Sequence, residues 1–156
     1  MEDFEWEIID LFNGSITGYS DMNGQTTVIK GIKTKYALHS SVVDPVGGES
    51  TSNIYLTSMF KTLGAEAVIK NIEFKLNVNS YNSDGTGLLN LSHVAGIAQY
   101  NLGIINNVIV SGTLDARSQK GIDLGGFVYR NYGTIFNSKL KAERINLKIT
   151  GGNGSL

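Results

Sequence analysis

The chain lacks cysteine and has a single proline among its 156 residues. The absence of cysteine excludes disulfide bridges and thiolate metal sites. Glycine is abundant instead: its 19 residues make up about 12% of the chain, against a usual value near 7%. Much glycine with almost no proline is typical of short strands joined by tight turns, and it predicts an all-β protein.

Charge and long apolar runs are also scarce. Charged residues make up 17% of the chain and the net charge is −1, so no basic field favours nucleic acid as a partner. No apolar run reaches the roughly 18 residues that a membrane span needs. The N-terminal residues 1–7 are acidic and lack the basic and apolar regions of a signal peptide.

Two stretches of the chain repeat each other at a fixed distance. Residues 125–138 read GGFVYRNYGTIFNS, and residues 95–108 read AGIAQYNLGIINNV. Corresponding positions are 30 residues apart (127 − 97 and 137 − 107). The matched residues of the second copy are Phe127, Asn131, Gly133, Ile135 and Asn137. Such self-similarity indicates one supersecondary unit stacked on another.

Further copies are weaker. Residues 28–36 resemble residues 68–76 with an offset of 40 (68 − 28), and residues 13–18 are a candidate partial copy. The alignment predicts an internal ladder and a row of corner positions. The ladder contains Ile29, Ile69, Ile105 and Ile135, and the corners are Gly31, Asn71, Asn107 and Asn137. A corner asparagine can bond both the backbone and the asparagine of the next unit.

Apolar and polar residues alternate after each corner, as Ile72 and Phe74 do with Glu73 and Lys75. Period two means strands with one buried face. One such unit cannot bury that face alone, so it stacks on the next. The sequence therefore predicts a short parallel β-helix (β-solenoid) of about four to five rungs with an N-terminal cap. An antiparallel sandwich is the alternative, and the fixed offset argues against it.

The expected organisation has three parts. They are a cap or partial rung at 1–23, solenoid repeats at 24–150 and a tail at 151–156. In the cap, Phe4 and Trp6 alternate with Glu5 and Glu7, which favours a strand over a short amphipathic helix.

The best copy resembles the GLUG repeat, whose pattern is roughly Gly-Gly-(Leu/Phe)-Val-Gly-x-Asn-x-Gly-x-Ile-x-Asn-(Ser/Cys). Residues 126–138 carry most of that pattern and residues 96–108 a degraded copy, although Tyr129 stands where the family has a second glycine. Such repeats occur in large bacterial surface proteins and adhesins, and are similar to segments of right-handed β-helices. The resemblance implies a β-helical module on or outside the cell surface. It implies no catalytic residues, because the pattern is structural.

Two groups of side chains are candidates for ligand binding. The first is a stripe of outward-facing lysines that would attract an anionic polysaccharide, namely Lys33, Lys35, Lys75, Lys139 and Lys141. The alternative for these lysines is a solvated face that keeps the strands soluble. The second group is Tyr129, Arg130 and Tyr132, since exposed aromatic rings stack on sugars. The alternative for these residues is packing at a corner.

No catalytic constellation is evident. Asp115 and Asp123 border one loop, but aspartate is common in turns for backbone reasons. His39 and His93 have no acidic neighbour and no partner at metal-ligand spacing. We therefore expect no enzyme activity, no cofactor and no metal.

The sequence favours a non-catalytic structural or adhesive module of a bacterial cell surface or filamentous assembly. Expected partners are copies joined end to end, other domains of a larger chain, or a polysaccharide or host-surface ligand. Two alternatives stay open. A groove with clustered Asp, Lys and Arg would favour a carbohydrate-active β-helix that binds or cleaves a polysaccharide, and a homotrimer would favour a phage tail component.

Overall fold

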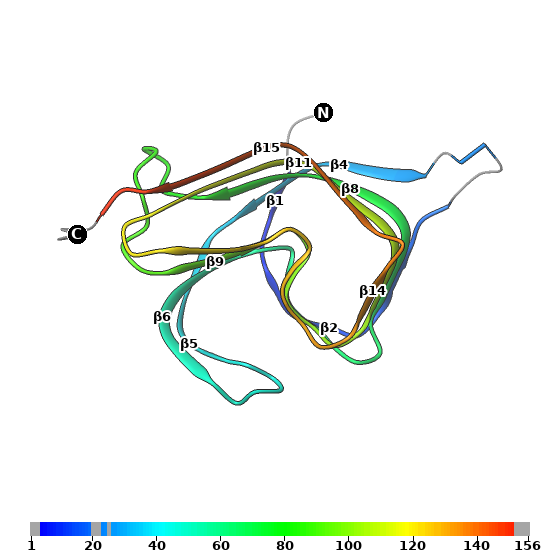
Figure 1. Ribbon diagram of the computed structural model, residues 1–156, viewed down its shortest axis with the longest axis horizontal. Coiled ribbons are helices and arrows are strands. Elements are labelled where there is room, and N and C mark those ends of the chain that lie inside the picture. Colours follow the sequence, from blue (N-terminus) through cyan, green and yellow to red (C-terminus); the bar gives the residue numbers. More distant parts are fainter. Residues whose placement is uncertain (1–3, 20–22, 25, 152–156) are drawn as a thin grey trace.

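The computed structural model describes residues 4–19, 23–24 and 26–151. These residues form an all-β structure with no helix (Figure 1). Most of the expected tail, and parts of the expected cap, lie outside the described residues. Strands at Phe4–Trp6 and Ile9–Phe12 occupy the segment for which a short helix was the alternative, so the alternation of apolar and acidic residues predicted the element type correctly.

The strands form three sheets. The long-strand sheet contains β1 (Phe4–Trp6), β3 (Ser15–Thr17), β4 (Thr27–Lys35), β8 (Val68–Ser80), β11 (Ile104–Ser118), β14 (Thr134–Phe136) and β15 (Lys139–Ile149). The short-strand sheet contains β2 (Ile9–Phe12), β7 (Phe60–Leu63), β10 (Ala98–Asn101) and β13 (Val128–Asn131). The hairpin sheet contains β5 (Ala37–Val43), β6 (Ser50–Thr57), β9 (Ser92–Ala95) and β12 (Ile122–Gly125).

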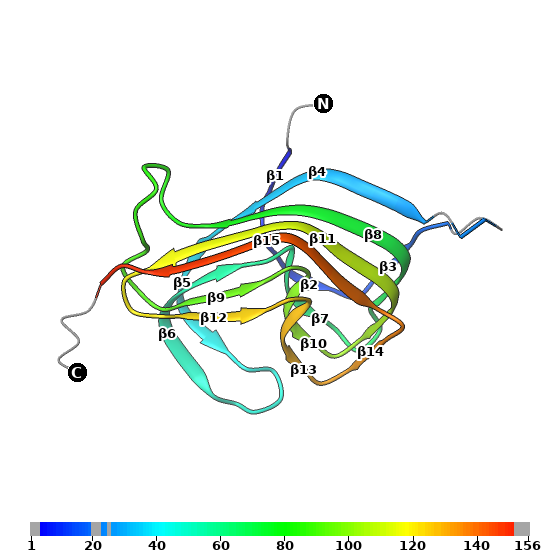
Figure 2. The same cartoon turned by 45° about the horizontal axis from the view of Figure 1, so that its top comes forward.

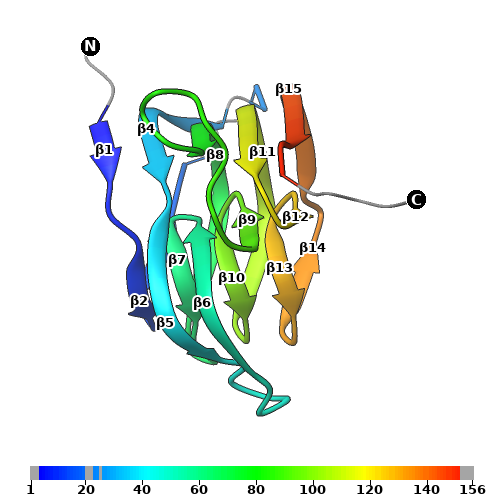
Figure 3. The ribbon, with the colours of Figure 1, turned by 90° about the vertical axis from the view of Figure 1, so that its left-hand side faces the viewer.

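The chain visits the three sheets repeatedly in the same order. Strands β6, β7 and β8 form one layer, β9, β10 and β11 the next, and β12 to β15 the terminal layer. Equivalent strands lie side by side in Figure 3. Pairing between layers is parallel. Between the last two layers it keeps the 30-residue offset as far as Gly112, as in Ile105 with Ile135, and an irregularity after Gly112 changes the offset to 31. The repeat seen in the sequence is therefore a repeat of parallel strand pairing.

The N-terminal layer departs from this pattern. Strands β2, β3 and β4 add in parallel to β7 and β8, whereas β5 turns back on β6 as an antiparallel hairpin. The hairpin tip reaches beyond the other strands of its sheet (Figure 1). Pro45 lies in this tip, where no strand pairing needs its missing N–H.

The register of the N-terminal layer corrects one sequence prediction. Ile69, Ile105 and Ile135 lie side by side, but Ile29 pairs with Phe74 rather than with Ile69. The neighbour of Ile69 is Ile16, in the candidate partial copy. The 28–36 alignment was wrong because its alternating residues match β8 equally well after a shift along the strand. The shift is five residues at Ile29 (74 − 69) and four at Ile32 (76 − 72), because the irregularity between Lys30 and Ile32 resets the alternation.

The predicted corner positions are equivalent in the later layers but not in the N-terminal layer. Asn71, Asn107 and Asn137 all have positive φ, between 51° and 56°, a conformation that asparagine tolerates better than most residues. The Nδ2 of Asn107 donates to Oδ1 of Asn71 at 3.0 Å. Gly31 is not the equivalent residue, since it lies at an irregularity between Lys30 and Ile32 in the pairing of β4 with β8. Gly18 lies against Asn71 instead, with its N–H bonded to the Lys70 carbonyl.

The core lies between the three sheets. It is built from the inward residues of the inner layers, among them Phe60, Ile69, Phe74, Ile97, Val110 and Leu114. In the terminal layer the same face is open, and Leu140, Ile145, Leu147 and Ile149 of β15 are 42–61% exposed. Among the described strands, β15 pairs only with β11. The terminal layer therefore has strand pairing on one side and an uncovered apolar row.

Candidate functional site

The tip of the β5–β6 hairpin is bound to the terminal layer by a buried carboxylate. Asp44 is only 2% exposed. Its Oδ1 accepts hydrogen bonds from the N–H groups of Val46 and Gly47 at 2.9 and 3.0 Å. Its Oδ2 accepts a bond from Nη1 of Arg130 at 2.5 Å and another from the Tyr132 hydroxyl. We call Asp44, Arg130 and Tyr132 the hairpin contact.

The hairpin contact is electrostatically satisfied. Burial opposes ionisation of Asp44, but bonds from Tyr132, the two backbone N–H groups and Arg130 outweigh it and hold its pKa well below the usual range. The bond to Asp44 raises the pKa of Arg130 and also that of the Tyr132 hydroxyl. Arg130 has a second acceptor, Glu49, at 3.1 Å. Both acceptors of the guanidinium therefore come from the hairpin, which makes Arg130 an anchor for it.

An aromatic stack lies beside the hairpin contact. The rings of His93 and Tyr129 are stacked, with centroids 4.0 Å apart and planes at 24°. The Tyr100 ring meets Tyr129 edge-on at 6.3 Å, and burial raises the pKa of the Tyr100 hydroxyl to about 12. His93 Nε2 lies 3.3 Å from Oδ2 of Asp123. Burial lowers the pKa of His93 despite that carboxylate, so its imidazole is neutral near pH 7.

The 30-residue offset made Tyr100 and Arg130 register-equivalent in the sequence, but sequence reasoning did not extend it to His93 and Asp123. The offset that relates the two best copies also pairs His93 with Asp123 and Tyr100 with Arg130 (123 − 93, 130 − 100). The statement that His93 has no acidic neighbour was therefore wrong in three dimensions. No comparable signal points to Asp44, which lies 86 residues before Arg130.

The five candidate lysines all lie on the long-strand sheet but do not form one stripe. Lys75 pairs with Glu143 at 2.6 Å and Lys35 with Glu5 at 2.8 Å, so a carboxylate accompanies each. Ser111 separates Lys75 from Lys141 in the strand pairing, and Ile109 neighbours Lys139. Among the described residues, Lys33 has no carboxylate within ion-pair distance.

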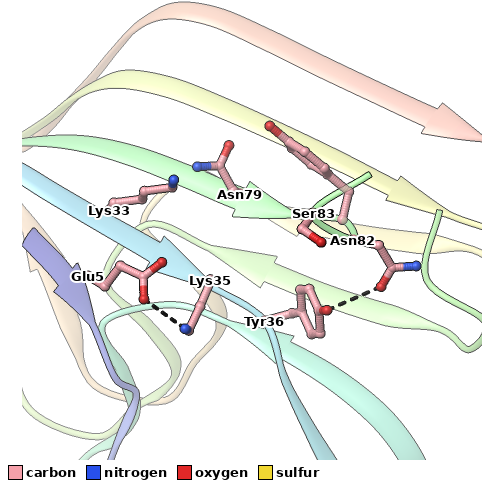
Figure 4. Close-up of a pocket in the computed structure, with 8 residues that line it drawn as sticks. Glu5, Lys33, Lys35, Tyr36, Asn79, Asn82 and Ser83 are labelled. Carbon is pink, nitrogen blue, oxygen red and sulfur yellow. Dashed lines mark hydrogen bonds and ion pairs between the residues drawn. The ribbon is translucent and has the colours of Figure 1, made fainter. Parts of the chain in front are cut away.

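A groove of about 460 Å³ opens beside Lys33. Its floor is the outward face of β1, β4 and β8, and its wall is the loop that follows β8. Figure 2 shows this loop standing away from the strands. Figure 4 shows Lys33 and Asn79 pointing toward one another across the floor, with Tyr36 and Ser83 at the far end. Sequence reasoning selected Lys33 and Lys35 but not the groove, which depends on the path of the loop.

The arrangement gives no support to hydrolytic or metal chemistry in the described part of the chain. Asp115 faces Arg117 at 3.5 Å and Arg144 at 4.0 Å on the long-strand sheet, whereas Asp123 belongs to the hairpin sheet. The two carboxylates thus face different partners on different sheets and do not form one site. Over residues 4–19, 23–24 and 26–151, no three His, Asp or Glu side chains converge as metal ligands would.

Comparison with known proteins found no family model, no curated protein and no solved structure that matches this chain. The described residues include no helix with the length and apolar character needed to cross a membrane.

Proposed function

We propose that this chain is a non-catalytic structural and adhesive module of a bacterial cell surface or filamentous assembly, built as a right-handed parallel β-solenoid that joins other copies end to end. The GLUG-like residues 126–138 support the cell-surface assignment by resemblance. The parallel pairing of layers that repeat in sequence supports the solenoid assignment.

The uncovered row on β15 carries the proposal. Leu140, Ile145 and Leu147 continue the inward face that is fully buried one layer earlier, and the outer edge of β15 has no strand partner among the described residues. An unpaired edge beside exposed apolar side chains is a template for adding another strand. The apolar row therefore favours addition of another layer to β15 over exposure of β15 to solvent.

The opposite end of the stack supplies a matching surface. The inward residues of the N-terminal layer are exposed there too, at 61% for Phe4, 40% for Ile9 and 36% for Ile29. Strand β2 there pairs only with β7 among the described strands. A second copy placed with its N-terminal layer against β15 would cover apolar residues on both sides. Contact between two different ends is heterologous, so it produces filaments unless the rotation closes a ring.

Analytical ultracentrifugation over a range of protein concentrations tests the proposal. The native chain should gain mass as concentration rises, and Leu147→Lys should stay a monomer because it places a charge in the apolar row. Asn146→Lys introduces the same side chain one residue earlier, on the opposite face of β15, and should associate like the native chain. A native chain that remains monomeric, or equal loss of association in both variants, would contradict the proposal.

A further inference from the structure

The groove beside Lys33 has a preformed wall. The loop after β8 is braced by Arg117, whose Nη1 donates to the Gly85 carbonyl at 2.7 Å and whose guanidinium covers the Tyr81 ring at 4.7 Å. On the other side, the Tyr36 hydroxyl donates to Oδ1 of Asn82 at 3.1 Å. Asn82 also donates to the Thr86 hydroxyl at 2.9 Å. The loop is thus fixed at both ends, and binding would not have to order it.

Several polar groups in the groove have no protein partner among the described residues. They are the Lys33 ammonium, the Asn79 Oδ1 and the Ser83 hydroxyl, since the only bond of the Asn79 side chain runs from its Nδ2 to Asn77. Lys35, by contrast, is paired with Glu5. The groove therefore offers one unpaired cation, one acceptor and one hydroxyl near the Tyr36 and Tyr81 rings, and the Glu5–Lys35 ion pair also lines it.

These groups select a class of ligand. A single unpaired lysine cannot neutralise the successive phosphates of a nucleic acid. Hydroxyl and amide groups beside tyrosine rings suit a sugar, whose hydroxyls both donate and accept and whose ring faces contact aromatic surfaces. One cation suits one carboxylate per sugar unit. The volume of about 460 Å³ is in the range of small-molecule sites.

We propose that this groove binds a uronic acid residue of an acidic polysaccharide, with Lys33 holding the carboxylate and Asn79 and Ser83 bonding ring hydroxyls. This ligand would be what the proposed adhesive module attaches to, so its biological role rests on the proposed function, whereas the binding itself does not. The binding site is complete within one chain, because β1, β4, Tyr36 directly after β4, β8 and the loop after β8 supply every lining residue.

Calorimetric titration of the full chain with a hexamer of galacturonic acid tests the proposal, with the fully methyl-esterified hexamer as the uncharged probe. We expect saturable binding of the acid with a dissociation constant of about 1 mM or lower. The ester should bind about tenfold more weakly, the usual effect of losing one charge-assisted hydrogen bond.

Lys33→Gln should weaken binding of the acid about tenfold. The variant should also bind acid and ester with equal affinity, because it lacks the lysine–carboxylate ion pair that only the acid can form. Lys139→Gln removes an exposed lysine of the same sheet outside the groove and should bind like the native chain. Asn79→Asp adds a negative charge that repels the ligand carboxylate, so it should weaken binding of the acid more than binding of the ester.

Three results would overturn the proposal: no saturable binding up to about 10 mM acid, equal affinity of the native chain for acid and ester, or equal weakening by Lys33→Gln and Lys139→Gln. The monomeric Leu147→Lys variant should bind the hexamer unchanged. A chain that associates without binding the hexamer therefore disproves the ligand alone, and one that binds without associating disproves only end-to-end assembly.

Discussion

Strands β11 and β15 carry the same alternating pattern and pair with each other, yet their inward faces differ in exposure. Val110, Leu114 and Ala116 of β11 are fully buried. Their β15 neighbours in the pairing are Leu140, Ile145 and Leu147, which are 42–47% exposed. The alternation decides which way a side chain points, whereas burial depends on layers to both sides. β11 has two such layers and β15 has one.

Among the described strands, the terminal layer lacks a second stacked layer, but the hairpin tip contacts it through the hairpin contact. Arg130 and Tyr132 belong to or follow β13, and Asp44 reaches them from a hairpin that begins in the N-terminal layer. The hairpin thus holds the last layer at one corner, while β15 stays open on the long-strand sheet. The inner layers should consequently depend on apolar packing and the terminal layer on this polar contact.

Truncating the same residue type in the two strands should give the largest difference. Leu114→Ala removes a fully buried side chain, and we expect it to lower the free energy of unfolding by about 2–5 kcal/mol. Leu147→Ala, at 46% exposure, should cost about 1 kcal/mol or less in the monomer. Urea denaturation at low protein concentration measures both values. Equal losses would mean that β15 is as well packed as β11.

Breaking the hairpin contact should have an intermediate effect. Asp44→Asn keeps the size of the side chain but removes its negative charge and one of the two acceptor oxygens shared by Arg130 and the backbone, and we expect the free energy of unfolding to fall by about 1–3 kcal/mol. Hydrogen exchange should rise in β13 and the hairpin while β11 stays protected. Glu49→Gln is the matched control, because Glu49 is largely exposed and lies further from Arg130. A stability unchanged by Asp44→Asn would show that the contact does not anchor the hairpin.

The same contact predicts a dependence on pH. The folded state holds the pKa of Asp44 below the ordinary value of 3.8, so the carboxylate contributes its full stabilisation above that value. The contribution is lost as pH falls below 3.8 toward the lower folded pKa. Denaturation at several pH values should therefore show the native chain and Asp44→Asn converging in acid. A constant difference between them at all pH values would contradict the assignment.

The asparagine corners should give the smallest difference. Asn107→Gly keeps a residue that accepts positive φ but removes the bond to Asn71, at a cost of about 1 kcal/mol. Asn137→Gly in the terminal layer should change stability by less than about 0.5 kcal/mol. Thermal unfolding of the two variants side by side measures the difference. A larger loss for Asn137→Gly would reverse the comparison.

The sequence predicted the parts of the structure that its repeat encodes. Ile105 and Ile135, which are 30 residues apart, pair with each other in neighbouring strands, and the alternation of apolar and polar residues identified the strands. The pairing of Ile29 could not be obtained, because no sequence pattern marks the irregularity between Lys30 and Ile32 that sets the register of β4 on β8. The hairpin contact and the groove wall join Asp44 to Arg130 and Tyr36 to Asn82, contacts that no local pattern specifies.

We propose that another copy completes the uncovered face of β15. Hydrogen exchange of residues 139–149, measured at rising protein concentration, tests it most directly. We predict that amides on the outer edge of β15 exchange rapidly in dilute protein and become protected as concentration rises, while Leu147→Lys shows no such change. Exchange of β15 that is independent of concentration in the native chain would contradict the claim.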